Sequence, residues 1–313
     1  MRPIRLCALL LLPLLLAGCA AKVADPKDFT AEALPSSNLP PLSVYVVEAD
    51  ALVQMDVETY VAGVVAGEMP NTWPLEALKA QAILARTFVL KFVSEKESRY
   101  PGANISTDIA EAQAYNAEAV NERILQAVQE TTGLILLNED GTLPYAWFHS
   151  HSGGMTALAT EALDWRGTEP LHTRVTPGME NSAAPQSVQS WAAVFTAADF
   201  LSACRDAGYA VSSCESVEIG ETGPSGRAVT LLVDGTPVNA ARVRISLGSS
   251  AMRSTLLTEL SKDGDTIRMS GRGYGHGVGM SQWGAYALAE EGWSAEEIAL
   301  HYYNGLKLVR AWE

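Results

Sequence analysis

Residues 64–88, "VVAGEMPNTWPLEALKAQAILARTF", join two apolar helical patterns and place one charged side chain within each of them. The first pattern begins after Asp56, a residue type that caps helix N-termini. Its apolar face recurs at i, i+4 and i+7 from Val57, and Glu68 continues that face at i+11. Pro70 disfavours helical backbone at the residue before it, so we expect Glu68 in the last turn. A carboxylate therefore lies where the pattern predicts a buried side chain.

The second pattern predicts a longer helix that begins around Pro74, a residue type favoured in the first helical turn. At about 100° per residue, Arg86 lies roughly 20° from Leu75 around the axis, on the apolar face. A buried cation needs a partner, and Glu68 is the nearest candidate in the sequence. The pattern therefore favours an ion pair between Glu68 and Arg86. The apolar stripe comprises Leu75, Leu78, Ala82, Ala85, Val89 and Phe92.

Two interpretations of Glu68 stay open at this point. Apolar neighbours and a helix C-terminus would both raise the pKa of its carboxyl group, whereas an adjacent Arg86 would lower it. If desolvation dominates, Glu68 can hold a proton near neutral pH and donate it to a glycosidic oxygen. If Arg86 dominates, the two residues form a structural ion pair.

The composition suits a globular protein and argues against nucleic acid as a partner. The chain has 313 residues, of which 48% are hydrophobic and 19% are charged, enough for one large domain or two smaller ones. Its formal net charge of −14 opposes binding to a phosphate backbone, which depends mainly on clustered Lys and Arg.

The N-terminus predicts export and a lipid anchor. Residues 1–18 contain two arginines followed by an apolar run too short to span a bilayer, which is typical of a secretory signal. The end of this segment resembles the bacterial lipobox, in which Cys19 would carry the lipid; a plain signal peptide with a chance cysteine is the alternative. Residues 19–42 are rich in Ala, Pro and Ser and predict a flexible tether. Ala20 and Ala21 suggest the outer membrane of a bacterial envelope that has two membranes.

The remaining chain, residues 43–313, predicts an α+β fold with mixed helical and β parts. Strands are expected at 43–49 and 51–55, and a helix at about 119–131. Residues 186–267 combine a helical segment with alternating strands about Asp234-Gly235, and they predict a β-rich subdomain. Near the C-terminus two helices are expected, the second with a capping box from Ser294 to Glu297.

Residues 133–154, "GLILLNEDGTLPYAWFHSHSGG", predict a hairpin about Asp140-Gly141 whose second strand delivers His149, His151 and Ser152. His149 and His151 would share one face of that strand, and His276 could join them as a zinc ligand. No cysteine lies near them in the sequence, so we favour histidines that hydrogen-bond beside a substrate groove. A histidine-ligated metal hydrolase is the competing hypothesis.

Glycines alternate with larger residues at 271–279. In an extended chain this pattern sends every larger side chain to one face and leaves the other bare, so that a polymer or a backbone can approach closely. A structural crossing of two backbones is the alternative. Elsewhere, Cys204 and Cys214 could form a disulfide in an exported protein, or remain two buried thiols.

Taken together, these motifs resemble the SpoIID/LytB family, named for a stage II sporulation protein and an amidase enhancer. The matching pieces are "GVVAGEMPNTWPLEALKAQAILARTF", "FHSHSGG", "SGRAVTLLV" and "GRGYGHGVGMSQWGA", which occur in that order between Val57 and Gly305. The resemblance implies a peptidoglycan lytic transglycosylase that acts on glycan strands stripped of stem peptides. It further implies that Glu68 is the catalytic acid and that Arg86 is functionally important.

The implied reaction needs one carboxylic acid. Glu68 would protonate the oxygen between N-acetylmuramic acid and N-acetylglucosamine and then, as a base, help the muramyl 6-hydroxyl to close a 1,6-anhydro ring. A glycoside hydrolase would ordinarily need a second carboxylate, for which Asp108 and Glu111 are weak candidates. The further groove candidates are Gln81, His149, Ser152, His276 and Gln282.

The amidase-enhancer side of the resemblance supplies the alternative function, a non-catalytic wall-binding protein that stimulates an N-acetylmuramoyl-L-alanine amidase. The expected partners are therefore peptidoglycan strands, a cell-wall amidase and, through the lipid anchor, a membrane. Some similar proteins bind zinc through cysteine and histidine near the site, and this chain lacks that cysteine.

Overall fold

The computed structural model describes residues 39–313. The predicted signal segment, Cys19 and most of the predicted tether lie outside the described residues. Strand β1 begins at Leu42, the last residue assigned to the tether. Within residues 39–313, no helix combines the length and the apolar character that a membrane span requires.

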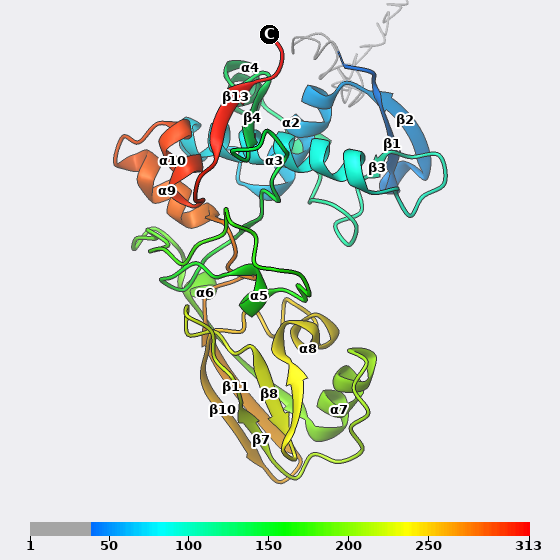
Figure 1. Ribbon diagram of the computed structural model, residues 1–313, viewed down its shortest axis with the longest axis vertical. Helices are drawn as coiled ribbons and strands as arrows, with labels where there is room; N and C mark the ends of the chain where they lie inside the picture. Colours follow the sequence, from blue (N-terminus) through cyan, green and yellow to red (C-terminus); the bar gives the residue numbers. More distant parts are fainter. Residues whose placement is uncertain (1–38) are drawn as a thin grey trace, which may run out of the picture.

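The first lobe, at the top of Figure 1, is built on two helices and a small three-stranded sheet beside them. Both predicted helices and the predicted strand at 51–55 are confirmed. The strand expected at 43–49 ends at Val46, and a 3-10 helix, Val47–Ala49, follows it. Asp56 caps the first helix by accepting a hydrogen bond from the Glu58 amide at 2.9 Å, and Pro74 is the N-cap residue of the second. The elements are β1 (Leu42–Val46), β2 (Ala51–Met55), β3 (Ile105–Ser106), α2 (Val57–Glu68) and α3 (Leu75–Glu95).

Later segments complete the core of this lobe around α2 and α3. The predicted helix at about 119–131 is present as α4, and the capping box of Ser294 and Glu297 is confirmed at the start of α10. Most of the predicted apolar face of α3 is fully buried. The added elements are α4 (Glu122–Glu130), β4 (Leu134–Leu137), α9 (Gln282–Glu290), α10 (Ala295–His301) and β13 (Lys307–Arg310).

The predicted hairpin at 133–154 is wrong. The turn at Asp140-Gly141 forms, but β4 pairs antiparallel with β13 instead of with the segment that follows the turn. That segment contains Pro144, which cannot donate to a strand ladder. Its short strand β5 (Phe148–His149) instead pairs in parallel with β12 (Met280–Ser281). This pairing joins the histidine segment to the start of α9.

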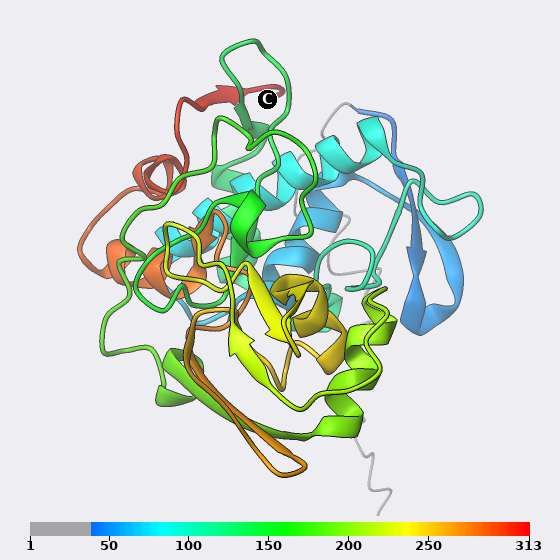
Figure 2. The same cartoon turned by 60° about the horizontal axis from the view of Figure 1, so that its bottom comes forward.

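The second lobe has its own hydrophobic core and extends away from the first (Figure 1). Figure 2 turns this lobe toward the viewer, with the orange hairpin β10–β11 at its tip. The predicted turn at Asp234-Gly235 is confirmed, with positive φ angles of 47° and 78°. Cys204 and Cys214 are buried free thiols. One sheet consists of β10 (Leu257–Asp263), β11 (Thr266–Arg272) and β6 (Ser190–Thr196), and the other of β7 (Val217–Ile219), β8 (Thr230–Val233) and β9 (Thr236–Asn239).

Short helices α5 (Ala159–Ala162) and α6 (Gln186–Gln189) lie between the lobes in Figure 1, and α7 (Ala197–Asp206) and α8 (Ala240–Leu247) pack within the second lobe. The whole is an α+β fold, as the sequence predicts. The boundaries 186–267 of the β-rich subdomain remain a prediction.

The glycine-alternating segment differs from the extended strand that the sequence predicts. After β11 the backbone is left-handed at alternate residues, with φ of 81° at Gly273 and 113° at Gly275. A Cβ at Gly275 would lie 2.7 Å from the Cβ of His149, and one at Gly279 would lie 2.0 Å from the Trp147 carbonyl oxygen. The bare face of the segment therefore packs on the chain's own residues 147–153. This supports the alternative that the glycines allow two backbones to cross closely.

Candidate active site at the end of helix α2

Glu68 is the last residue of α2, as the sequence predicts, and its carboxyl group is held by two donors from distant segments. The backbone N–H of Ala114 donates to Oε1 at 2.8 Å, and Nε2 of Gln282 donates to Oε2 at 3.3 Å. The side chain is half-buried. Glu68 is thus fixed in position while part of it stays accessible, which a proton donor requires.

Two glycines of α2 allow the Ala114 segment to approach so closely. A Cβ at Gly67 would lie 2.7 Å from the Ala114 carbonyl carbon, and one at Gly63 would lie 2.2 Å from the Tyr115 ring. The Asn116 N–H also donates to the Gly63 carbonyl at 2.9 Å. Because neither glycine carries a side chain, the loop lies directly against the helix and its amide reaches Glu68.

Burial raises the pKa of Glu68 above its ordinary value, because desolvation disfavours the anion more than the two hydrogen bonds favour it. The bonds from Ala114 and Gln282 act in the opposite direction. No Lys, Arg or His within the described residues forms an ion pair with Glu68. Of the two interpretations of Glu68 that the sequence left open, the structure supports the desolvated acid and not the ion pair with Arg86.

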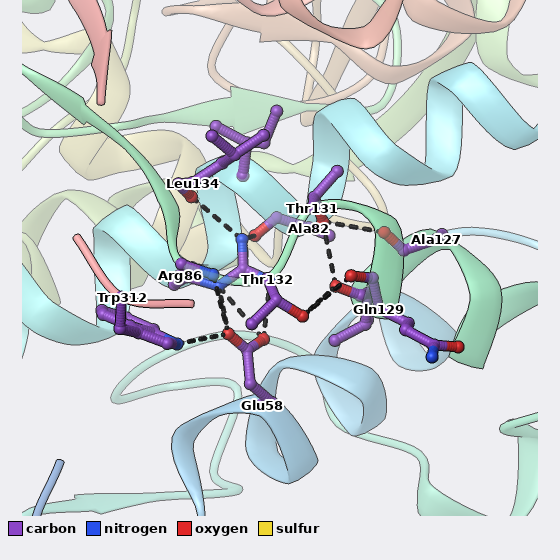
Figure 3. Close-up of polar contacts among 12 residues, drawn as sticks. Glu58, Ala82, Arg86, Ala127, Gln129, Thr131, Thr132, Leu134 and Trp312 are labelled. Carbon is purple, nitrogen blue, oxygen red and sulfur yellow. Dashed lines mark hydrogen bonds and ion pairs between the residues drawn. The ribbon is translucent and has the colours of Figure 1, made fainter. Parts of the chain in front are cut away.

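The predicted ion pair between Glu68 and Arg86 is wrong, because Arg86 pairs with Glu58 instead (Figure 3). Its Nη2 lies 2.6 Å from Glu58 Oε2 and its Nε lies 3.0 Å from Glu58 Oε1. Both side chains have 0% exposure. The third nitrogen, Nη1, donates to the Leu134 carbonyl at 2.9 Å, so the guanidinium is fully occupied.

The surroundings of Glu58 complete this buried pair. Glu58 Oε1 also accepts hydrogen bonds from the Gly133 N–H at 3.1 Å and from Trp312 Nε1 at 3.0 Å. The pair therefore links α2 and α3 to the start of β4 and to the end of the chain, as Figure 3 shows. Arg86 has no nitrogen left for a substrate, and its place is structural.

A count along the chain explains why Glu58, and not Glu68, faces Arg86. The short connection after Glu68 returns the chain into α3 at Leu75, so residues equally far from this connection lie opposite each other. Ten residues before Glu68 is Glu58, and ten after Leu75 is residue 85, beside Arg86. Glu58 and Glu68 are separated by about 15 Å along the helix axis. The partner of Arg86 can therefore be found from the sequence by counting outward from the connection between the two helices, but not by choosing the glutamate nearest in the chain.

Gln282 is brought to Glu68 by the pairing of β5 with β12. Ser281 is paired with His149, and the Trp283 N–H donates to the Ser150 carbonyl at 3.0 Å. Ser281 caps α9 by accepting from the Gly284 N–H at 3.2 Å. The histidine segment and the start of α9 therefore form one unit beside the Glu68 carboxyl group.

Glu180 is a second buried carboxylate near this unit that the sequence analysis missed. Its Oε1 accepts from the Ser152 N–H at 2.5 Å and from the Ser281 hydroxyl at 2.7 Å. It lies in a segment without periodic pattern, so no sequence signal marked it. The weak candidates Asp108 and Glu111 instead bind their own loop: Asp108 accepts from Tyr100 and Glu111 from Ser106.

The three predicted groove histidines lie together, but not as a metal site. The ring centroids of His149 and His276 are 5.7 Å apart, and His151 accepts a hydrogen bond from the Gly153 N–H through Nδ1. Burial and the nearby Arg244 and Arg227 lower the pKa of His276 to about 3. Within residues 39–313, no group of three or more His, Cys, Asp or Glu side chains is arranged to hold a metal ion.

Two buried glutamines have unpaired amide groups. Neither polar atom of the Gln81 or Gln113 side chain has a hydrogen-bond partner within the described residues. Gln113 directly precedes Ala114, whose amide binds Glu68, whereas Gln81 lies inside α3. Of the groove candidates, Gln282 contacts Glu68, and His149 and Ser152 lie in the adjoining segment. Gln81 forms no hydrogen bond with Glu68 or with any other described residue.

Comparison with known proteins identifies the family. A family model described as "Stage II sporulation protein" (SpoIID) matches residues 46–137. Stage II sporulation protein D of Bacillus subtilis (strain 168) is 33% identical over 287 residues, 86% of this chain and 79% of that protein. The chain belongs to the SpoIID family.

Two further relatives agree with membership of the SpoIID family. Stage II sporulation protein D of Bacillus amyloliquefaciens is 31% identical over 286 residues, 86% of this chain and 78% of that protein. An amidase enhancer of Bacillus subtilis is 28% identical over 299 residues, 79% of this chain but 40% of the enhancer. The resemblance stated from the sequence motifs is confirmed.

Proposed function

We propose that this SpoIID-family protein is a lytic transglycosylase of peptidoglycan, with Glu68 as its general acid and base. The observation that carries the proposal is the environment of Glu68. Its carboxyl group is half-buried, binds only two neutral donors, and has no cationic partner among the described residues. Such a group retains a proton at higher pH than an ordinary glutamate.

In the proposed reaction the Glu68 carboxyl group acts twice, and it begins by giving up this proton. Glu68 donates it to the glycosidic oxygen that links N-acetylmuramic acid to N-acetylglucosamine, and the bond to the muramyl C1 breaks. The Glu68 carboxylate then accepts a proton from the muramyl 6-hydroxyl, whose oxygen bonds to C1 and closes the 1,6-anhydro ring. The acid is regenerated and no water is consumed, so the mechanism needs no second catalytic carboxylate.

The position of Glu180 is consistent with this single-acid scheme. Its Oε1 accepts two hydrogen bonds from Ser152 and Ser281, and the side chain is 5% exposed. A carboxylate bound and buried in this way is poorly placed to activate water. We assign Glu180 a positioning role, in which it holds the histidine segment against the start of α9.

The alternative is a wall-binding protein that stimulates an amidase, favoured by the similarity to the Bacillus subtilis amidase enhancer. In that function Glu68 and Gln282 would bind glycan without cleaving it. We further propose export to the bacterial envelope through residues 1–18 and anchoring by a lipid on Cys19, at the outer membrane where there are two.

The test incubates the purified mature protein with peptide-free glycan strands and detects anhydromuramyl ends by mass spectrometry. We expect these ends with wild-type protein and a loss of about 10²-fold or more in their rate with Glu68→Gln. The matched control is Glu290→Gln, which alters an exposed glutamate at the last position of α9 and should leave the rate unchanged.

Two other results would contradict the proposed chemistry. Reducing muramyl ends would indicate hydrolysis. An absence of products, together with glycan binding and faster turnover by a cell-wall amidase, would favour the enhancer function.

A further inference from the structure

A cavity of about 660 Å³ lies beside the C-terminal part of α3, and neither Glu68 nor its hydrogen-bond partners line it. Its volume falls within the range of small-molecule sites, roughly 300–1,000 Å³. The chain enters α3 from Glu68 at Leu75, and Lys91 of the cavity is about 24 Å from Leu75 along the helix axis. The cavity is therefore distinct from the candidate active site. Its lining includes Lys91, Asn138, Asp140, Tyr145, Trp165 and Asn304.

Two rings of an aromatic corner, formed by Tyr145, Trp147 and Trp165, line this cavity. Tyr145 stacks on Trp147 with centroids 4.9 Å apart, and Trp165 lies at a steep angle to both, at 5.2 Å and 5.5 Å. Trp165 Nε1 donates to the Thr168 carbonyl at 2.9 Å, and the Tyr145 hydroxyl donates to Glu95 at 3.2 Å. Trp165 remains half-exposed. The corner is thus fixed before a ligand arrives, which lowers the cost of binding.

Polar side chains from two other segments line the same cavity. Asn138 and Asp140 belong to the turn after β4, which is held by a hydrogen bond from the Thr142 N–H to Asp140 Oδ1 at 3.0 Å. The Asn304 N–H donates to the His172 carbonyl at 2.8 Å and so brings the connection between α10 and β13 to the cavity. Within residues 39–313, the side-chain amide of Asn304 forms no hydrogen bond. These groups can serve the hydroxyl and amide groups of a ligand.

The charges around the cavity favour a neutral ligand. Lys91 already binds Glu95 at 2.6 Å and lies over the Tyr145 ring at 4.6 Å from its centroid. An anion would find this cation occupied and would face the exposed carboxylates of Glu139 and Asp140. A cation would find the Tyr145 ring already covered by Lys91. A neutral molecule with one apolar face and polar edges fits this lining best.

We propose that the cavity is a saccharide subsite, separate from Glu68, that binds an N-acetylated pyranose of a glycan strand against the aromatic corner. The inference rests on the proposed function in one respect, because it takes glycan as the ligand. A pyranose presents C–H groups on its faces and hydroxyl groups around its edge. One face can pack on the Trp165 ring while the edge hydrogen-bonds to Asp140 and Asn304. A second site on one polymer increases retention of the protein on the strand.

The experiment follows the indole N–H resonance of Trp165 by NMR in the mature protein. Its absence from the spectrum of Trp165→Phe assigns the resonance. The probe is chitotetraose, which contains N-acetylglucosamine but no muramyl residue, so its binding is independent of the proposed cleavage. We expect a saturable shift of the Trp165 resonance, with the same midpoint in Glu68→Gln.

Two substitutions test the lining of the cavity. Asn304→Ala removes an exposed amide, and we expect it to weaken binding about threefold or more at the Trp165 resonance. Trp165→Ala removes the stacking surface, and we expect calorimetry to show a loss of about tenfold. Trp293→Ala is the matched control, because Trp293 is also half-buried but does not line the cavity, and it should leave the affinity unchanged.

Thermal unfolding of each variant checks the fold. If Trp165→Ala does not fold, Asn304→Ala and the wild-type titration decide. An absent or non-saturating shift at Trp165, or an unchanged affinity in folded Asn304→Ala, would overturn the inference. A shift caused by a wall stem tetrapeptide and not by chitotetraose would overturn the assignment to saccharide.

The outcome is separable from that of the proposed cleavage. A protein that binds chitotetraose at Trp165 but yields no anhydromuramyl ends from glycan strands would support the subsite and contradict only the cleavage. A protein that yields these ends without a shift at Trp165 would support the cleavage and overturn the subsite.

Discussion

The two ends of α2 carry glutamates in opposite situations. Glu58, at the start of the helix, is fully buried and receives hydrogen bonds from Arg86, Gly133 and Trp312. Glu68, at the last position, is half-buried, and among residues 39–313 its carboxyl group binds an amide from Ala114 and one from Gln282 and no others. A carboxylate paired with a buried cation stabilises the fold, whereas one without a cation can keep its proton. The charge of the partner, more than the burial of the carboxyl group, therefore separates a structural glutamate from a candidate catalytic one.

The largest expected effect is on stability, at the Glu58 end. Arg86→Met leaves Glu58 as a buried, unpaired carboxylate, so we expect a loss of about 3–5 kcal/mol in the free energy of unfolding. Urea denaturation with circular dichroism measures it. Glu68→Gln, at the other end of the same helix, is the control and should change the free energy of unfolding by less than about 1 kcal/mol in either direction.

A double variant sharpens this prediction. Glu58→Gln together with Arg86→Met removes both charges, and it should be more stable than Arg86→Met alone. If Arg86→Met proves as stable as wild type, the pair does not have the structural role that we assign to it.

The second effect concerns the approach of Ala114 to the Glu68 end. Gly67→Ala places a methyl group where the Ala114 backbone lies, at 2.7 Å, so the loop must move away. We expect a loss of about 1–3 kcal/mol in the free energy of unfolding. The Ala114 N–H should also leave Glu68, and because this bond lowers the pKa of Glu68, that pKa should rise further. A shift of the alkaline limb of the pH–rate profile to higher pH would report the change.

Gly102→Ala offers a control for this variant, because Gly102 has a φ of 81° that disfavours a side chain, and a Cβ there would lie 3.3 Å from Leu52 and not against the Ala114 segment. It should lower stability without moving the pH–rate profile. An unchanged profile in Gly67→Ala would show that the Ala114 bond has no influence on the acid.

Much of the first lobe could be predicted from the sequence, because its elements are local. The cap at Asp56, the apolar faces of both helices and the position of Glu68 follow from spacing alone. The partner of Arg86 was predicted wrongly because Glu68 was chosen as the nearest glutamate in the chain. The antiparallel packing of α2 and α3 instead places Glu58 opposite Arg86. Counting outward from their connection would have indicated Glu58.

Other errors had non-local causes. The expected hairpin failed because β4 pairs with β13, a strand some 170 residues further along the chain, and no local pattern marks such a partner. Similarly, Glu180 acts through Ser152 and Ser281, which only the folded chain brings together. The alternating glycines were recognised as a close approach, but their left-handed backbone could not be inferred from a strand-like period.

The smallest expected effect is the pH dependence that Glu68 gives to stability. A carboxyl group whose pKa is raised in the folded state binds its proton more tightly there than in the unfolded chain. Stability therefore falls as the pH rises from the unfolded pKa through the folded one. We expect Glu68→Gln to gain stability relative to wild type across that window and to show no gain below it. Denaturation curves at several pH values measure the difference.

Titration of the Glu68 carboxyl group itself, by ¹³C NMR of protein labelled at glutamate side chains, directly measures whether this group holds its proton more tightly than an ordinary glutamate. Comparison with Glu68→Gln assigns the resonance. We expect a midpoint above the ordinary value of 4.5, because desolvation outweighs the two hydrogen bonds. A midpoint at or below 4.5 would contradict it, since Glu68 would then be an ordinary anion at neutral pH with no proton to donate.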